Sequence, residues 1–168
     1  MKHLICRIHR NSGSIFLVAV FSLGVIGLSS NTIEAADCNF KIIGGDTLQF
    51  DLKEIRVPKS CDVITVTVIN GGKMPVTAMG HNFALAKVSD WNALALSEAK
   101  RFPKSATDIS KDKRLIATTT FVGGAPGDPK EASVQIKRSS LDPKQEYQFF
   151  CSFPGHFATM NGKFILEK

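Results

Sequence analysis

The sequence is poor in several features that would place it in common classes of protein. Its 168 residues contain no arginine-rich block, and its single Trp and single Tyr are not interleaved with basic residues. Nucleic-acid-binding proteins cluster positive charge, so the scattered net charge of +6 indicates a solvated surface instead. The chain also lacks internal repeats, low-complexity tracts and long linkers. These absences favour one globular domain.

A hydrophobic run long enough to cross a membrane comfortably is missing as well. The apolar stretch 14–28 has 15 residues and follows a basic segment, whereas a transmembrane helix needs about 20 residues. This arrangement is typical of a secretory signal peptide, which we expect to span residues 1–36, with an uncleaved signal anchor as the alternative. Cleavage after Ala36 would release a periplasmic domain, residues 37–168, with no stable membrane insertion.

Cysteine is scarce, and its number becomes odd once the signal peptide is removed. Cys38, Cys61 and Cys151 would remain in an oxidising compartment, where two can pair and one cannot. A bridge between Cys38 and Cys61 would tie the N-terminal strand to its neighbour and leave Cys151 free. A free thiol needs protection from oxidation there, either as an inert buried side chain or as a metal ligand.

Most of the predicted domain shows the two-residue period of β-strands. Residues 63–70, VITVTVIN, show it most clearly, because isoleucine and valine alternate with threonine. Strands are expected at residues 39–43, 63–70, 81–86, 114–121, 132–137, 146–151 and 162–168, with Gly/Pro-rich turns between them. Residues 89–102 break the pattern and predict one helix that stops at Pro103. The pattern favours an all-β sandwich or barrel with one inserted α-helix.

The stretch CSFPGHFATM, residues 151–160, places a thiol, an imidazole and a thioether in one short loop. Cys151 ends a predicted strand, a Pro-Gly pair predicts a turn, and His156 and Met160 follow. Taken singly, each has an ordinary interpretation as a buried cysteine, an exposed histidine or a core methionine. Their clustering favours a metal site.

The types of donor in this loop narrow the choice of metal. Thiolate and thioether are soft donors, and no neighbouring carboxylate completes an oxygen cage for calcium or magnesium. Zinc rarely accepts a thioether. One thiolate, two imidazoles and a weak axial thioether form the donor set of an electron-transfer copper site. The second imidazole would be His81, the other histidine of residues 37–168, and Gly80 before it leaves room for a backbone carbonyl to approach the metal.

The motifs MGHN, residues 79–82, and FFCSFPGHFATMNG, residues 149–162, resemble those of the azurins, a family of bacterial cupredoxins. The similarity extends over essentially all of residues 37–168. It implies a Greek-key, cupredoxin-like β-sandwich and a small soluble blue copper protein that transfers single electrons by Cu(I)/Cu(II) cycling. The ligand set that the resemblance implies is His81, Cys151 and His156 in a trigonal plane, Met160 as axial ligand and the Gly80 carbonyl as a weak opposite contact.

The resemblance also assigns supporting residues. Asn82 would tie the two ligand segments together near the sulfur, and Phe153 would offer its backbone N–H to it. Cys38 with Cys61 matches the family's disulfide. Phe83 departs from the pattern, because it stands where azurins commonly have a buried tryptophan.

The edge of the His156 ring is expected to reach the surface within a small apolar patch. The patch would consist of Met74, Met79, Phe157 and Ala158, although the two methionines could also be ordinary turn residues. Such a patch suits brief docking of redox proteins, for example cytochromes or copper enzymes. One alternative function is a copper carrier. Another is a thiol hydrolase built on Cys151, but no orienting or oxyanion-binding group is evident, so we do not expect an enzyme.

Overall fold

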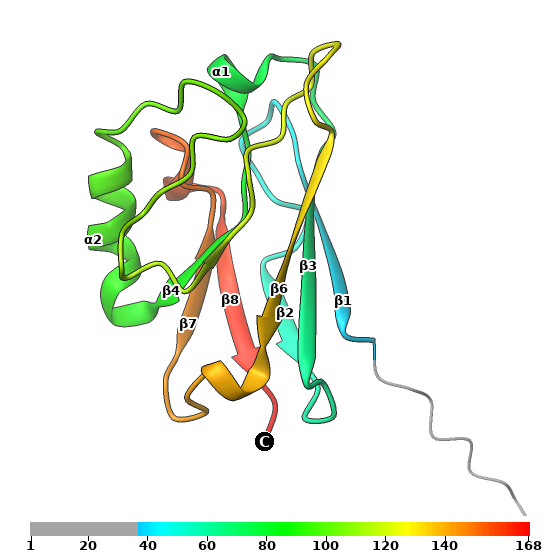
Figure 1. Ribbon diagram of the computed structural model, residues 1–168, viewed down its shortest axis with the longest axis vertical. Coiled ribbons are helices and arrows are strands. Elements are labelled where there is room, and N and C mark those ends of the chain that lie inside the picture. Colours follow the sequence, from blue (N-terminus) through cyan, green and yellow to red (C-terminus); the bar gives the residue numbers. More distant parts are fainter. Residues whose placement is uncertain (1–36) are drawn as a thin grey trace, which may run out of the picture. The chain divides into compact units, whose positions relative to one another are not determined.

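The computed structural model describes residues 37–168, and the expected signal peptide lies outside this range. Within these residues, eight strands form two separate sheets that face each other as a sandwich (Figure 1). The strand orders are β1-β3-β6 and β2-β8-β7-β4-β5, so strands far apart in sequence become neighbours. Of the two architectures that the period-two pattern allowed, the protein therefore adopts the sandwich.

The three-stranded sheet is built around the strand with the clearest alternation. Its strands are β1 (Asn39–Gly44), β3 (Val63–Asn70) and β6 (Glu131–Lys137); β3 runs parallel to β1 and antiparallel to β6. Ile64, Val66 and Val68 of β3 are fully buried between the sheets, while the threonines between them are half-buried on the other face. The sequence pattern thus fixes which face of the sheet turns inward.

The five-stranded sheet carries most of the aromatic core. Its strands are β2 (Glu54–Val57), β8 (Asn161–Leu166), β7 (Tyr147–Phe150), β4 (Ala84–Lys87) and β5 (Ala117–Thr118). Strand β2 runs parallel to β8, and the other pairs are antiparallel. Phe83 is fully buried and stacks on Phe149 at a centroid distance of 5.9 Å, with Phe164 at 6.5 Å. A phenylalanine therefore fills this core position, and it anchors the segment that carries His81.

Helix α2 (Val88–Glu98) covers the outer face of the five-stranded sheet over β4 and β7 (Figure 1). Its Leu94 packs against Ala84, Ala86 and Phe150 in a second apolar cluster, and Trp91 lies 6.1 Å from the Phe150 ring. The small alanines on the outer face of β4 let the helix approach closely. A second, single-turn helix, α1 (Val76–Met79), lies at the end of the sandwich that also holds the β7–β8 connection (Figure 1).

The main helix differs from the expected range 89–102 at both ends. It begins one residue earlier than expected, at Val88, with Lys87 as N-cap. It ends at Glu98, where Arg101 folds back and donates its backbone N–H to the Glu98 carbonyl at 2.8 Å. Pro103 also keeps Phe102 out of the helical conformation. The chain therefore leaves the helix before the proline.

The bounds of other elements also differ from the expected ones, where only a few residues pair with a neighbouring strand. The strand expected at 81–86 begins only at Ala84, and His81 pairs with Val122 through an isolated bridge. Within 114–121, only two residues join the sheet as β5. Strand β2 and helix α1 were not predicted, because four-residue elements offer too little periodicity to recognise.

The disulfide between Cys38 and Cys61 is present, and it joins the start of β1 to the segment before β3. Cys151 is free and buried.

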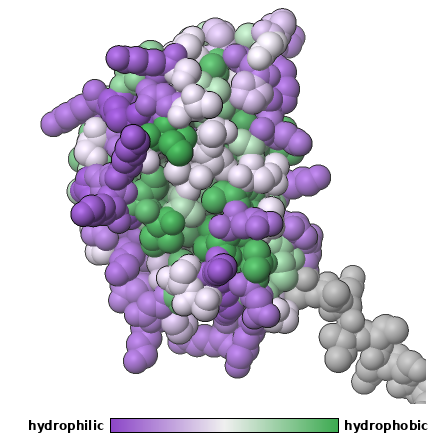
Figure 2. Space-filling model, in the orientation of Figure 1, coloured by the Kyte–Doolittle hydropathy of each residue, from purple (hydrophilic) through white to green (hydrophobic). Residues whose placement is uncertain are grey.

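Half-buried apolar residues close the core beside β5 and β6; they include Ile116, Ala117, Ala132 and Val134. On the face shown in Figure 2, apolar residues gather in the middle and hydrophilic residues surround them. Within residues 37–168, no helix has the length and apolarity that a membrane span needs.

Candidate metal centre

Two segments far apart in sequence carry the residues expected to bind metal. His81 follows α1 and is held opposite Val122 by two backbone hydrogen bonds of 2.9 and 2.8 Å. The other three residues belong to the β7–β8 connection, where Cys151 directly follows β7 and Met160 directly precedes β8. The neighbouring positions of β4 and β7 in one sheet bring the two segments together.

The β7–β8 connection is a closed loop fixed by its own backbone. The Cys151 N–H donates to the Met160 carbonyl at 2.9 Å, and the Met160 N–H donates to the His156 carbonyl at 2.9 Å. Gly155 has φ of +80°, a left-handed conformation that favours glycine, and it leads into the 3-10 turn that carries His156. The Pro-Gly turn read in the sequence therefore points the imidazole back towards the thiol.

The thiol and the two imidazoles converge at one buried point. The ligand atoms of His81, Cys151 and His156 all lie within 4.8 Å of one another. The Cys151 Sγ is 3.6 Å from His156 Nδ1 and 3.8 Å from the Gly80 carbonyl oxygen. The two imidazole centroids are 5.2 Å apart. The structure thus brings His81, which comes from far upstream, next to the sulfur.

His81 has one nitrogen that no group in the described protein satisfies. Its Nε2 lies 3.2 Å from the Gly45 carbonyl oxygen and so carries the ring proton, while Nδ1 is buried without a hydrogen-bond partner. Burial lowers the pKa of His81, so the ring is neutral and Nδ1 is a bare acceptor. Leaving such an atom unpaired costs about 1–3 kcal/mol. A metal ion beside Nδ1 would supply the missing partner.

Burial also sets the protonation of the other two groups. It lowers the pKa of His156 to about 4, and the nearby His81 adds to this because two protonated rings would repel each other; the His156 imidazole is therefore neutral at pH 7. It raises the pKa of the Cys151 thiol to about 12. The backbone N–H groups of Asn82 and Phe153 have the opposite effect on this pKa, because they favour the thiolate. A bound metal ion would displace the thiol proton, and those two N–H groups are in place to stabilise the resulting thiolate.

Met160 and Gly80 are the other two residues that were expected at the metal. Met160 is fully buried, and a Cβ atom added to Gly44 would meet the Met160 methyl at 2.8 Å and His81 Cδ2 at 3.2 Å. Gly44 therefore leaves the space that these two side chains share. A Cβ atom at Gly80 would lie 2.4 Å from the Val76 carbonyl oxygen, so this position also requires glycine.

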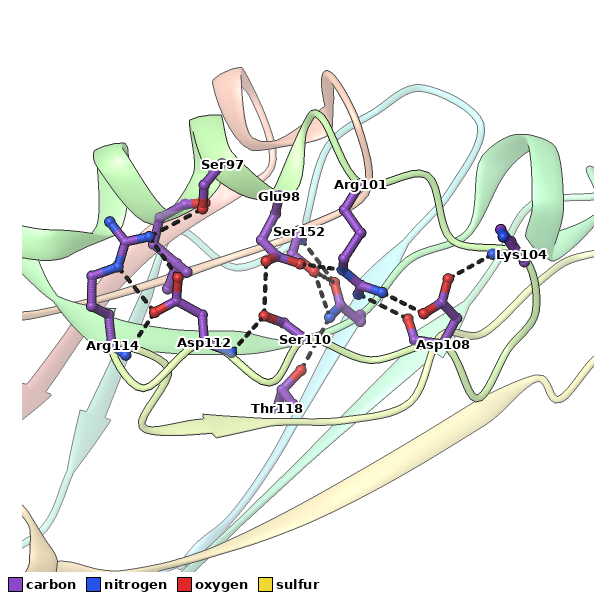
Figure 3. Close-up of polar contacts among 12 residues, drawn as sticks. Ser97, Glu98, Arg101, Lys104, Asp108, Ser110, Asp112, Arg114, Thr118 and Ser152 are labelled. Atoms are coloured by element: carbon purple, nitrogen blue, oxygen red, sulfur yellow. Dashed lines mark hydrogen bonds and ion pairs between the residues drawn. The ribbon is translucent and has the colours of Figure 1, made fainter.

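Asn82 joins the two segments as the resemblance implied. Its Oδ1 accepts the Ser152 N–H at 2.8 Å, and its Nδ2 donates to the hydroxyls of Ser152 at 3.0 Å and Thr118 at 3.1 Å (Figure 3). Both Asn82 and Ser152 are buried. The residue after His81 is thus bonded to the residue after Cys151.

The residues expected to form the surface patch differ in exposure. Met74 is 42% exposed and Ala158 is exposed, but Met79 is half-buried, and the half-buried Phe157 packs against the cluster beneath α2. His156 itself is only 5% exposed.

Sequence reasoning missed a more exposed aromatic residue, Phe102. This residue is 57% exposed, and its ring meets that of Phe153 edge to face at a centroid distance of 5.8 Å. The Phe153 ring lies 4.5 Å from the His156 ring. Its position in KRFPK, just after the helix, was the available signal.

The donor set fits copper better than other common metals. The close cluster found among residues 37–168 contains two imidazoles and one thiol but no carboxylate. Hard cations such as calcium and magnesium need oxygen ligands, whereas soft and borderline donors suit copper. The unpaired Nδ1 of His81 shows that the site is built for a further partner.

Comparisons with known proteins agree with this chemistry. Residues 36–167 match the family model of copper-binding proteins of the plastocyanin/azurin family. The chain is similar to azurin iso-2 of Methylomonas sp. strain J, with 38% identity over 79% of this chain and 100% of that protein. It is also 41% identical to azurin-1 of Alcaligenes xylosoxydans xylosoxydans, over 76% of this chain and 95% of that protein.

The solved structure of the Methylomonas azurin (Az-iso2) covers 79% of this chain and 100% of its own length, with 38% identity and a TM-score of 0.69. Fold, donor chemistry and similarity over most of the chain therefore lead to one conclusion. The chain belongs to the plastocyanin/azurin family and is a small blue copper protein that transfers electrons.

Proposed function

We propose that His81, Cys151, His156 and Met160 bind a single copper ion, with the Gly80 carbonyl as a weak further contact. Two observations support this most strongly: donor atoms of the buried His81, Cys151 and His156 lie within 4.8 Å of one another, and the buried Nδ1 of His81 has no hydrogen-bond partner. Bound copper supplies a one-electron couple, Cu(I)/Cu(II). The task of the protein is to hold the donors in one arrangement for both oxidation states.

Several features keep the donors in place without metal. The Cys151 and Met160 backbones are hydrogen-bonded to each other, Asn82 links the two segments, and the Gly45 carbonyl holds the His81 ring. Since the groups are buried and already converge, little rearrangement accompanies a change of charge at the site. A small rearrangement means a low barrier to electron transfer.

Adding Cu(II) to the purified metal-free protein tests the proposed ligands. The wild-type protein should develop an intense visible absorption from thiolate-to-copper charge transfer, and Cys151→Ala should abolish it. Met160→Ala should keep the absorption but change its position, because a thioether binds only weakly. An unchanged spectrum in Cys151→Ala would refute the ligand assignment.

A role as an electron carrier is favoured over an enzymatic one by the state of the thiol. A nucleophilic cysteine needs an accessible sulfur and a lowered pKa, whereas Cys151 is fully buried and burial raises its pKa to about 12. The same enclosure disfavours a copper carrier, because a metal ion held there would exchange slowly.

The compartment and the partners are part of the same proposal. Residues 1–36 act as a signal peptide and deliver the domain 37–168 to the periplasm, where the Cys38–Cys61 disulfide is stable. Transient partners such as cytochromes or copper enzymes dock at the end of the sandwich near His156. N-terminal sequencing of the exported protein should give a chain that begins at Asp37; a retained leader would refute the cleavage site.

A further inference from the structure

The connection between α2 and β5, residues 99–116, is ordered by a network of charged groups. The Glu98 carboxylate accepts hydrogen bonds from Arg101 at 2.9 Å and Ser110 at 2.8 Å, and Arg101 also pairs with Asp108 (Figure 3). Further along, Arg114 pairs with Asp112 at 2.6 Å. This network fixes a long connection that has almost no regular secondary structure.

The network leaves the segment with a surplus of positive charge. Both aspartates of the connection, and Glu98 before it, are ion-paired with arginine. Four lysines of the same segment are exposed and form no ion pair within the described part of the chain: Lys100, Lys104, Lys111 and Lys113. Their charges are therefore available to a partner.

An exposed aromatic ring stands among these lysines. Phe102, between Lys100 and Lys104 in sequence, is 57% exposed and contacts Phe153. The Phe153 ring packs against His156 at 4.5 Å and is steadied by Phe121 at 6.1 Å. A single buried ring thus separates the surface ring from a proposed copper ligand, while His156 itself is nearly covered.

The loop between β1 and β2, residues 45–53, has two aspartates and one lysine, so it carries no such surplus. The loop after β1 places the exposed Asp46 near His81, and its Oδ2 accepts the Lys73 backbone N–H at 2.9 Å. Asp51 lies on the same loop. The connection 99–116 therefore contributes more positive charge than the loop after β1, and this difference would orient an incoming charged protein.

We propose that Phe102, flanked by Lys100 and Lys104, is the docking site for a redox protein with an acidic surface around its own redox group. The inference rests on the proposed copper function. One electron passes between the bound copper and the partner, so that Cu(I) becomes Cu(II) as the partner is reduced by one electron, or the reverse. No bond is made or broken, and no proton is transferred.

Two forms of one probe test the charge of the docking site. Native mitochondrial cytochrome c is cationic, and its lysine-succinylated form is anionic, so the same haem presents either charge. The rate constant of the copper-loaded protein with the succinylated form should fall as ionic strength rises, and the rate constant with the native form should rise. At low ionic strength, the double substitution Lys100→Glu/Lys104→Glu should slow transfer to the succinylated form about tenfold.

A matched control separates local charge from net charge. Lys59→Glu/Lys137→Glu makes the same change in net charge, and Lys137 pairs with Val63 at the end of β3 remote from the site. The control should change the rate constant less than twofold. Phe102→Ala should slow transfer to both cytochromes at every ionic strength, whereas Leu96→Ala, which removes an exposed apolar residue of α2, should not.

The visible copper spectrum is recorded first for each variant. A wild-type protein without charge-transfer absorption would overturn the proposed function and this inference with it. Intact spectra, combined with equal effects of the two charge-reversing pairs, or with no effect of Lys100→Glu/Lys104→Glu, would overturn the docking site alone.

Discussion

At the scale of single residues, Gly44 is required by the crowding around two proposed ligands. In Gly44→Ala, the new Cβ would lie 2.8 Å from the Met160 methyl and 3.2 Å from His81 Cδ2. Overpacking of this kind should lower the free energy of unfolding of the metal-free protein by about 1–3 kcal/mol. It should also shift the copper absorption, because the thioether and the imidazole must move.

Gly45→Ala is the matched control, since its nearest contact would be an ordinary 3.6 Å from the Gly72 nitrogen. Urea denaturation and the visible spectrum of both variants check the prediction. Equal behaviour of the two alanine variants would show that the space beside Gly44 does not matter.

Asn82 holds the two ligand segments together through its side-chain amide. Asn82→Leu keeps the approximate volume but leaves the buried Ser152 N–H without its acceptor. This should cost about 1–3 kcal/mol of stability and speed the loss of copper to a chelator. Thr118→Val removes only one partner of the amide, and its effect should be smaller. Chelator-induced decay of the absorption measures both; equal decay in wild type and Asn82→Leu would contradict this role.

The lowered pKa of His156 predicts that the stability of the metal-free protein depends on pH. Burial lowers its pKa from 6.5 to about 4, so between these values the unfolded chain binds a proton that the folded protein does not. Stability should therefore be complete above about pH 6.5 and fall as the pH falls towards 4, by up to about 3 kcal/mol. Urea denaturation across this range, compared with His156→Gln, isolates the effect. A stability difference between the two proteins that does not vary with pH would refute it.

At the scale of elements, strands with clear alternation were predictable and short elements were not. Residues 63–70 form β3 with the expected bounds, because one face is buried along the whole strand. Strand β2 and helix α1 escaped prediction, since each has four residues and depends on tertiary pairing. The end of α2 was placed too late, because the reversal at Arg101 depends on contacts that the sequence does not display.

The disulfide stabilises the arrangement of β1 and β3 at the start of β1, whereas Gly44 at the other end of that strand borders the site. Cys38→Ser/Cys61→Ser removes a cross-link between residues 23 apart, which should lower the free energy of unfolding by about 3 kcal/mol. The copper spectrum should stay the same. Calorimetry and spectroscopy test the two parts; a lost or altered absorption would mean that the cross-link also shapes the site.

At the scale of the whole molecule, the candidate site was more predictable than the surface around it. Residues 37–168 contain two histidines and one unpaired cysteine, so few ligand sets were possible. The surface depends instead on how connections fold. Phe102 gains its position from the charged network that orders residues 99–116, and its place in KRFPK does not by itself indicate that the ring reaches Phe153.

The central claim is that His81, Cys151 and His156 enclose one copper ion. A crystal structure of the copper-loaded protein, with anomalous scattering recorded at the copper absorption edge, tests it most directly. The account predicts one anomalous peak within bonding distance of His81 Nδ1, Cys151 Sγ and His156 Nδ1. A peak elsewhere, or His81 Nδ1 turned away from the metal, would contradict it.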